Sequence, residues 1–443
     1  MTGRQVLPAP VAGSDGLPLL GPLRSALSGS GPALAPHACD RPVDPAALLP
    51  LTADEDDDGD PVAAVVSTTG STGRPKHVLL TASALLASAA ATHDALGGAG
   101  TWLLAVPAHT VAGVQVLIRS LVAGTRPAVL DLSGGFDPVG FAAAAGDMAS
   151  AARGRRYTSL VPAQLDLLLE AGREHQRVIQ ALRGFDTVLV GGAALPPSVR
   201  GRAEHAGVRV VSTYGMTETC GGCVYDGVPL PGVQILLGPD EGGGSTGRDS
   251  SDSRDGRDGA PGRVVVVGPV VARGYRTAGA PSPSTGFGEG FAVVDGRRAF
   301  RTADRGLLVE GRLELVGRID DVVTSGGVNV ALGAVDRVLR AQPGVRDCLV
   351  VAVPSERWGS QVGALVVDAA TGAADDLRLR TAVRDALGGA AVPRLLRHLD
   401  RLPLTGVGKP DRAEAVRLLT PVHAPGPRLG DHGGPDDPSE ETA

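Results

Sequence analysis

Two lysines stand out as candidates for a chemical role, because nearly all of the positive charge of this chain is carried by arginine. Lys76 and Lys409 are the only lysines among 42 basic residues, and the other forty are arginines. Lysine presents a compact point charge on a thin stem, whereas arginine is a planar fork. We interpret each lysine as retained where arginine does not fit, with retention by chance as the alternative. Asn329, the sole asparagine, lies in the glycine-containing segment 324–329.

The first lysine closes a run of small polar residues. All seven residues at 67–73 are serine, threonine or glycine, and they connect the apolar segment VAAVV (62–66) to Arg74-Pro75-Lys76. Glycines let backbone N–H groups point inward and hydroxyls add further donors, so a loop of this kind after a buried strand suits a polyphosphate. It is not a Walker A loop, because Gly-Lys-Ser/Thr is missing. The pattern favours phosphate binding over a flexible linker.

A second segment, TYGMTE at 213–218, brings an aromatic ring, a hydroxyl and a carboxylate together at the end of a predicted strand. Tyr214 offers a face that can stack on a base, and Thr217 offers a hydroxyl to a phosphate oxygen. Glu218 suits Mg²⁺, a hard cation that usually takes one or two protein carboxylates. For this segment alone, an ordinary strand-to-loop turn is the alternative.

Two acidic segments and a second glycine-rich loop follow later in the chain. RTAD (301–304) precedes GRIDD (317–321), and PLTGVGK (403–409) ends on Lys409. Asp304 can accept both ribose hydroxyls, as acidic residues do in nucleotide-binding folds, and Arg318 adds a donor. Solvated surface charge is the alternative for either residue. The glycines before Lys409 predict that it is carried by a mobile loop.

Taken together, the five segments resemble the adenylate-forming superfamily in their order and spacing. That family contains acyl-CoA synthetases, luciferases and the adenylation domains of peptide synthetases, and the resemblance covers residues 60–412. Five motifs in the family's order are far more specific than any one of them. One departure is Thr-Ala-Asp at 302–304, where the family usually has Thr-Gly-Asp.

The resemblance implies a nucleotide-binding role for most of the matching residues. The β- and γ-phosphates of ATP would be held by Thr68, Thr69, Gly70, Ser71, Thr72, Gly73 and Lys76. Adenine would lie between two segments, one formed by Gly191, Gly192 and Ala193 and the other by Tyr214 and Gly215. Thr217 would contact the α-phosphate, Glu218 would hold Mg²⁺, and the ribose would meet Asp304 and Arg318.

The remaining roles concern the acid, the thiol and a domain movement. Asp320 would be the hinge between a large and a small domain, and Lys409 would reach in for adenylation. Gly326 and Gly327 would approach the pantetheine arm of CoA. His109 stands where the family places a gating residue at the acyl pocket, and a satisfied buried histidine is the alternative.

The reaction that the resemblance implies has two half-reactions. A carboxylate attacks the α-phosphate of Mg·ATP to give an acyl-adenylate and pyrophosphate, and the thiol of coenzyme A then takes the acyl group. Two features are most similar to those of the o-succinylbenzoate–CoA ligases of menaquinone synthesis. They are the sequence Thr-Tyr-Gly-Met-Thr-Glu-Thr-Cys at 213–220 and the short N-terminal region. Three alternatives stay open: a ligase for another aryl or short-chain acid, an enzyme that loads a carrier protein, and a non-catalytic nucleotide-binding relative.

The alternation of strands with helical stretches predicts a large N-terminal α/β domain of mainly parallel sheet with helices, plus a β-rich subdomain. A hinge joins it to a small α+β C-terminal domain that begins near Asp321. We expect an N-terminal extension at 1–60, an adenylation domain at 61–320 with a disordered loop at 239–261, a C-terminal domain at 321–418 and a disordered tail at 419–443.

Composition argues against several classes of protein. The 42 basic and 48 acidic residues give a net charge of −6, which argues against a nucleic-acid-binding surface. No apolar run reaches the roughly 18 residues of a membrane helix and no signal-peptide pattern opens the chain, so a cytoplasmic protein is expected. Four cysteines form no disulfide framework, and Cys220 and Cys223 lack further ligands at zinc spacing. The oligomeric state stays open, a homodimer included.

Overall fold

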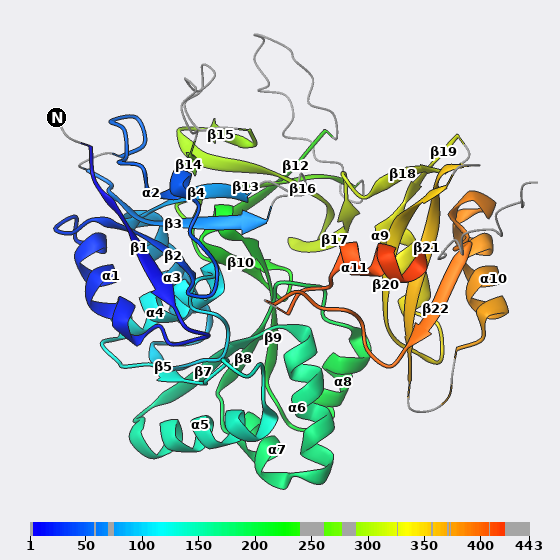
Figure 1. The fold of residues 1–443 in the computed structure, drawn as a ribbon, viewed down its shortest axis with the longest axis horizontal. Helices are drawn as coiled ribbons and strands as arrows, with labels where there is room; N and C mark the ends of the chain where they lie inside the picture. Colours follow the sequence, from blue (N-terminus) through cyan, green and yellow to red (C-terminus); the bar gives the residue numbers. More distant parts are fainter. Residues whose placement is uncertain are drawn as a thin grey trace, which may run out of the picture.

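The computed structural model describes residues 3–56, 59–69, 75–239, 261–276, 289–325, 327–355, 358–369, 372, 374–406 and 408–420. Within these residues the chain forms four β-sheets with helices packed around them, and the last sheet stands to one side as a small C-terminal domain (Figure 1). No helix in this part of the chain is both long and apolar enough to cross a membrane.

The central sheet of the large domain has seven strands in the order β11-β10-β9-β8-β7-β5-β6. Five are parallel: β9 (Val210–Met216), β8 (Thr187–Val190), β7 (Arg155–Leu160), β5 (Gly100–Leu104) and β6 (Ala128–Val129). The other two, β10 (Gly221–Tyr225) and β11 (Val228–Pro229), turn back antiparallel. The parallel strands therefore end along one edge of the sheet, where ligands of such folds bind.

Helices cover both faces of this sheet. One face packs against α5 (Pro138–Ala151), α6 (Pro162–Glu174), α7 (Gln176–Arg183) and α8 (Pro197–His205), through a core that includes Phe141 and Leu165. The other face packs against α3 (Ala82–Ala95) and α4 (Val111–Ala123), where Leu85, Leu117 and Trp102 are buried. Both cores are built mainly from alanine, valine and leucine, as expected for a chain with 3% aromatic residues.

The N-terminal sheet has the order β1-β2-β3-β4-β14. Its strands are β1 (Val6–Val11), β2 (Ala33–Ala38), β3 (Val62–Thr69), β4 (Pro75–Thr81) and β14 (Gly274–Tyr275), with the short helices α1 (Leu20–Leu27) and α2 (Pro45–Leu48) alongside. Strands β1 and β2 precede residue 60 and pair in parallel with each other, and β2 pairs with β3. The segment predicted as a separate extension thus folds with the large domain.

The β-rich subdomain and the small domain complete the chain. The former contains β12 (Gln234–Gly238), β13 (Gly262–Val267), β15 (Phe291–Val294), β16 (Arg297–Val309) and β17 (Arg312–Arg318). The latter contains β18 (Val322–Ser325), β19 (Val328–Ala331), α9 (Leu332–Arg340), β20 (Val345–Ser355), β21 (Gly359–Asp368), α10 (Asp376–Leu387), β22 (Leu395–Leu399) and α11 (Arg412–Leu419). The predicted fold class, a large α/β domain with a small α+β domain, is confirmed.

Side-chain caps explain where several helices begin. Thr81, Thr110 and Asp411 each accept a hydrogen bond from a backbone N–H in the first turn of α3, α4 and α11. Such caps satisfy N–H groups that have no partner inside the helix. Two predictions of disorder cannot be compared with the structure, since residues 240–260 and 421–443 lie outside the described part of the chain.

Candidate active site

The carboxyl ends of the parallel strands β8 and β9 carry two of the predicted nucleotide-binding segments. Gly191, Gly192 and Ala193 follow the last residue of β8, and β8 pairs with β9, which contains Tyr214. A Cβ on Gly191 would lie 2.1 Å from Thr213 Oγ1, so a larger residue does not fit while the strands keep this spacing. Thr213 therefore packs directly against the backbone of Gly191, which holds this segment close to β9.

Glycine is also required at Gly215, the next residue of β9 after Tyr214. A Cβ there would lie 2.0 Å from the carbonyl oxygen of Gly221, on the antiparallel partner strand β10. The close pairing of β9 and β10 fixes the backbone that leads into Thr217 and Glu218.

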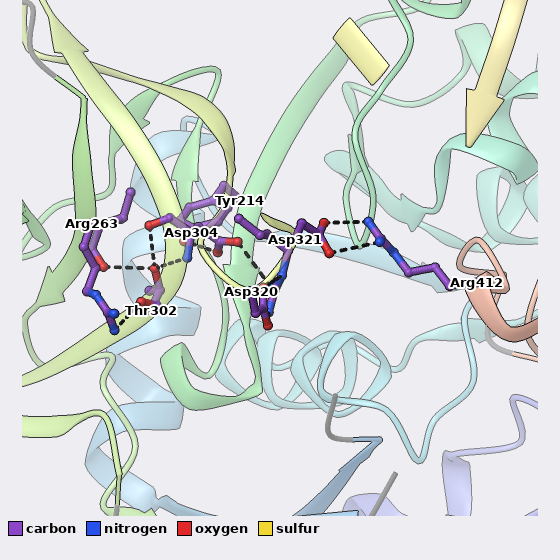
Figure 2. Close-up of polar contacts among 9 residues, drawn as sticks. Tyr214, Arg263, Thr302, Asp304, Asp320, Asp321 and Arg412 are labelled. Atoms are coloured by element: carbon purple, nitrogen blue, oxygen red, sulfur yellow. Dashed lines mark hydrogen bonds and ion pairs between the residues drawn. The ribbon is translucent and has the colours of Figure 1, made fainter. Parts of the chain in front are cut away.

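Tyr214 forms a hydrogen bond with the buried Asp304. The Tyr214 hydroxyl donates to Asp304 Oδ2 at 2.7 Å, and Arg318 Nη1 donates to Oδ1 of the same carboxylate at 3.3 Å. Burial raises the pKa of Asp304, and the tyrosine hydroxyl and the guanidinium oppose that rise. Figure 2 shows the ring of Tyr214 beside Asp304. The carboxylate predicted to bind ribose thus touches the ring predicted to stack on the base.

The predicted hinge lies between two bidentate ion pairs. Arg318 donates from Nε and Nη2 to the two carboxylate oxygens of Asp320 at 2.8 and 2.6 Å. Arg412, the first residue of α11, donates to both oxygens of Asp321 at 3.0 and 2.7 Å (Figure 2). One pair ties Asp320 back to the large domain, and the other ties its neighbour to the C-terminal helix.

Glu218 lies in a short 3₁₀ turn (Thr217–Thr219) that follows β9. Its Oε1 accepts a hydrogen bond of 2.6 Å from the Tyr275 hydroxyl, and its backbone oxygen accepts one of 2.8 Å from Ala272 N. Lys76 Nζ lies 4.8 Å from the centre of the Tyr275 ring. Tyr275 therefore joins the carboxylate predicted for Mg²⁺ to the lysine predicted for the phosphates.

Lys409 is presented by a tight turn of the small domain. Thr405 N donates to Lys409 O at 2.7 Å, and Lys409 N donates to Thr405 Oγ1 at 3.2 Å. Gly408 has φ of +77°, and a Cβ there would lie 2.9 Å from Val161 Cγ2 of the large domain. Glycine is needed at this position both for its backbone conformation and for the close approach.

The side chain of Lys409 reaches across to the large domain. A Cβ on Gly192 would lie 3.6 Å from Lys409 Cε, so the lysine passes directly over the predicted adenine segment. Burial lowers the pKa of Lys409 below its ordinary value, and the nearby Glu218 carboxylate opposes this. The structure thus brings together Gly192, Glu218 and Lys409, which are far apart in the sequence.

Other predicted residues lie elsewhere or are not described. Gly327, with φ of +83°, forms the turn between β18 and β19, where Thr324 Oγ1 hydrogen-bonds to Asn329 Oδ1 at 3.0 Å. His109 precedes α4, has no hydrogen-bond partner for Nδ1 among the described residues, and has its pKa lowered by burial. Thr68 Oγ1 donates to Lys76 O at 3.4 Å. Gly70, Ser71, Thr72, Gly73 and Gly326 lie outside the described residues.

Sequence reasoning missed Tyr275 and Arg412. The contact from Tyr275 to Glu218 spans 57 residues and has no local pattern. One signal was available, because the chain has only four tyrosines. The partner of Arg412 is 91 residues away, so the ion pair with Asp321 is visible only in the fold.

Fold and site together define a nucleotide-binding enzyme in which a small domain brings a lysine to a site on a large domain. The chain belongs to the AMP-binding enzyme family, because that family's sequence profile matches residues 25–276. The profile of the AMP-binding enzyme C-terminal domain matches residues 334–409. The predicted membership of the adenylate-forming superfamily is confirmed.

Individual relatives agree with this assignment. A probable 2-succinylbenzoate–CoA ligase of Mycobacterium tuberculosis is 40% identical over 408 residues, which are 92% of this chain and 96% of the relative. A feruloyl-CoA synthase of an Amycolatopsis species is 31% identical, over 81% of this chain and 70% of the relative. The structure of o-succinylbenzoate CoA synthetase from Bacillus subtilis, with its acyl-adenylate intermediate, shares the fold at a TM-score of 0.60, with 21% identity over 89% of this chain and 80% of that one.

Proposed function

We propose that this chain is a cytoplasmic, AMP-forming acid–CoA ligase that converts 2-succinylbenzoate to its CoA thioester in menaquinone synthesis. The observation that carries the proposal is the meeting of Lys409, Glu218 and the Gly191–Ala193 segment at one sheet edge. The relative of M. tuberculosis, similar over almost its whole length, supports the choice of acid.

In the first half-reaction the acid's carboxylate attacks the α-phosphate of ATP and pyrophosphate leaves. Adenine lies against the Gly191–Ala193 segment and Tyr214, and the ribose hydroxyls bond to Asp304. Thr217 donates to the α-phosphate, and Lys76 with the loop from Thr68 holds the β- and γ-phosphates. The ammonium of Lys409 neutralises the negative charge that builds on the transferring group. Such fixed charges are the main source of catalysis in transfers of this kind.

Glu218 fits a magnesium ion. Its Oε1 accepts from Tyr275, and the structure describes no hydrogen bond to its Oε2. No group of three or more His, Cys, Asp or Glu side chains suited to a metal occurs among the described residues. Mg²⁺ usually binds through one or two carboxylates together with substrate phosphates, so a carboxylate with one oxygen that accepts no described hydrogen bond suits it. When bound, the ion would neutralise phosphate charge.

In the second half-reaction CoA attacks the acyl-adenylate and AMP leaves. The small domain rotates about Asp320, Lys409 withdraws, and the Gly326-Gly327 segment approaches the pantetheine arm. Asp320→Pro fixes φ near −65° and restricts this rotation. The adenylate should then still form while the thioester step slows, and equal loss of both steps would argue against the hinge.

We further propose that a buried cation on α4 receives the second carboxylate of 2-succinylbenzoate. Arg119 is 4% exposed, donates to the Tyr225 hydroxyl at 3.4 Å and lies 5.0 Å from the Trp102 ring centre. Among the described residues no carboxylate forms an ion pair with it. An unpaired buried charge is costly unless a partner arrives. One turn earlier, Gln115 Cγ would lie 3.4 Å from a Cβ on Gly221, beside the Tyr214–Glu218 segment.

The test is a comparison of kcat/KM for 2-succinylbenzoate, benzoate, octanoate and ferulate. We expect 2-succinylbenzoate to be preferred, and preference for any other acid in the panel would overturn the choice of substrate. Arg119→Met should lower the value for 2-succinylbenzoate and leave that for benzoate nearly unchanged, whereas Arg119→Lys should retain part of the preference. Thermal unfolding of both variants controls for loss of the fold.

A further inference from the structure

A cluster of charged side chains joins the two domains at some distance in sequence from the catalytic lysine. Arg346, on β20 of the small domain, donates from Nη1 to Oε1 of Glu170 on α6 of the large domain at 2.6 Å. Its Nε lies 4.0 Å from Oδ2 of Asp166, one helical turn earlier on α6. One arginine thus contacts two carboxylates that share a face of the same helix.

Further contacts tie this cluster to both domains. Arg346 Nη2 donates to the backbone oxygen of Asp400 at 2.9 Å, and Ser198 Oγ of α8 donates to Arg346 O at 3.3 Å. Arg401 Nη2 lies 4.0 Å from Glu170 Oε2. Asp400 and Arg401 begin the segment that leads to Lys409, so the cluster fixes the base of the loop that carries the lysine.

The same helix receives the catalytic loop at its N-terminal end. Val161, directly before α6, is the residue against which Gly408 packs. Helix α6 therefore contacts the small domain twice, through Gly408 at its start and through Arg346 at its middle. Rotation of the small domain would separate both contacts, and only the second is electrostatic.

We propose that Arg346, Glu170 and Asp166 form an electrostatic latch that holds the small domain in the pose that presents Lys409, and that the latch opens between the two half-reactions. This inference rests on the proposed two-step reaction. The side chains are 20% to 30% exposed, so water can replace their contacts when the domains separate. A pair of this exposure shifts an equilibrium by about fivefold or less, which suits a contact that must break in every turnover.

The test measures the pose directly. The interdomain distance is measured between two spin labels, one at Ser150→Cys in the large domain and one at Leu377→Cys in the small domain. Both changes are made in a Cys39→Ser background, which removes the exposed native thiol. Glu170→Gln should increase the population of a second distance by about two- to fivefold. The matched control is Glu204→Gln. Glu204 and its partner Arg200 both lie on α8, so this pair stays within the large domain. The control variant should leave the distance distribution unchanged.

Rates give a second readout. Glu170→Gln should slow pyrophosphate release in the first half-reaction and leave thioester formation from preformed acyl-adenylate unchanged or faster. Arg346→Gln should change the distances and rates in the same direction as Glu170→Gln, and the double change Glu170→Gln with Arg346→Gln should add little beyond Arg346→Gln alone. Identical distances and rates for Glu170→Gln and Glu204→Gln would overturn the latch. If the wild-type enzyme forms no acyl-adenylate, the proposed function fails, and the distance measurement still decides on the latch.

Discussion

The two sides of the active site are held by different kinds of contact. The large-domain side is held by short hydrogen bonds between groups of that domain, such as Tyr214 to the buried Asp304 at 2.7 Å and Tyr275 to Glu218 at 2.6 Å. The small-domain side is a turn whose internal bonds join Thr405 and Lys409, and it is anchored to the large domain by partly exposed ion pairs such as Arg346 to Glu170. Breaking the bond to the buried Asp304 carboxylate leaves that group unsatisfied, whereas water readily replaces a partly exposed ion pair.

This difference separates the groups that bind the nucleotide from the part of the chain that moves between the half-reactions. In the proposed reaction, groups that hold the nucleotide act in both half-reactions, since the AMP moiety stays bound until the thiol attacks. Lys409 acts in only one under this proposal, which fits its place on a part of the chain whose contacts are easily broken. The contrast predicts that changes on the two sides affect the half-reactions differently.

The largest effect is expected for Lys409→Ala. Losing one preorganised charge at the transferring group lowers the rate by about 10²–10³-fold. Thioester formation from preformed acyl-adenylate and CoA should stay nearly normal, because the lysine has withdrawn by then. Lys409→Arg should rescue adenylation poorly, since a planar fork does not sit where a point charge does. Quenched-flow measurements of the two half-reaction rates check this prediction. An equal fall in both rates would contradict the proposed difference between the large-domain and small-domain sides of the site.

A smaller effect that reaches both steps is expected for Asp304→Ala. The change removes the acceptor of the buried Tyr214 hydroxyl and of Arg318. Leaving such a group unsatisfied costs about 1–3 kcal/mol. We expect a raised KM for ATP and a slower thioester step from added acyl-adenylate. Normal thioester formation in this variant would mean that Asp304 does not hold the AMP moiety, and melting temperatures control for a general loss of stability.

The smallest effect is expected far from the site, at His398 of the small domain. Partial burial lowers the pKa of this imidazole, but hydrogen bonds and charge from Asp376 and Asp368 outweigh it, so the pKa is raised. A raised pKa in the folded state gives stability that is present at low pH and lost as pH rises through that pKa. His398→Asn should therefore lose about 0.2–1 kcal/mol of unfolding free energy at pH 5.5 and less at pH 8.5. Urea titrations at the two pH values measure this, and an equal loss at both would contradict the charge pairing.

Much of the fold was predictable because its signals are local. The helix that begins after Thr81 and the strands at Thr187–Val190 and Val210–Met216 follow from apolar runs bounded by capping or glycine residues. Order of motifs along the chain was enough to predict the family. The segments around Tyr214, Asp304 and Lys409 were recognised from residue types that recur at fixed spacing.

The contacts between distant segments were not predictable in the same way. Nothing local marks Tyr275 as the partner of Glu218, or Arg346 as the partner of Glu170, 176 residues away. The role of the first sixty residues was also hidden, because the short strands β1 and β2 are rich in alanine and proline and show no alternation of apolar and polar residues. Their place in the N-terminal sheet depends on pairing with β3.

The central claim is that this chain makes an acyl-adenylate first and a thioester second. It is tested most directly by a single turnover with Mg·ATP and 2-succinylbenzoate, with enzyme in excess of ATP and CoA withheld. We predict pyrophosphate and enzyme-bound acyl-adenylate in equal amounts, followed by conversion of the adenylate to AMP and the CoA thioester when CoA is added. Release of ADP and phosphate, or no pyrophosphate until CoA is present, would contradict the account.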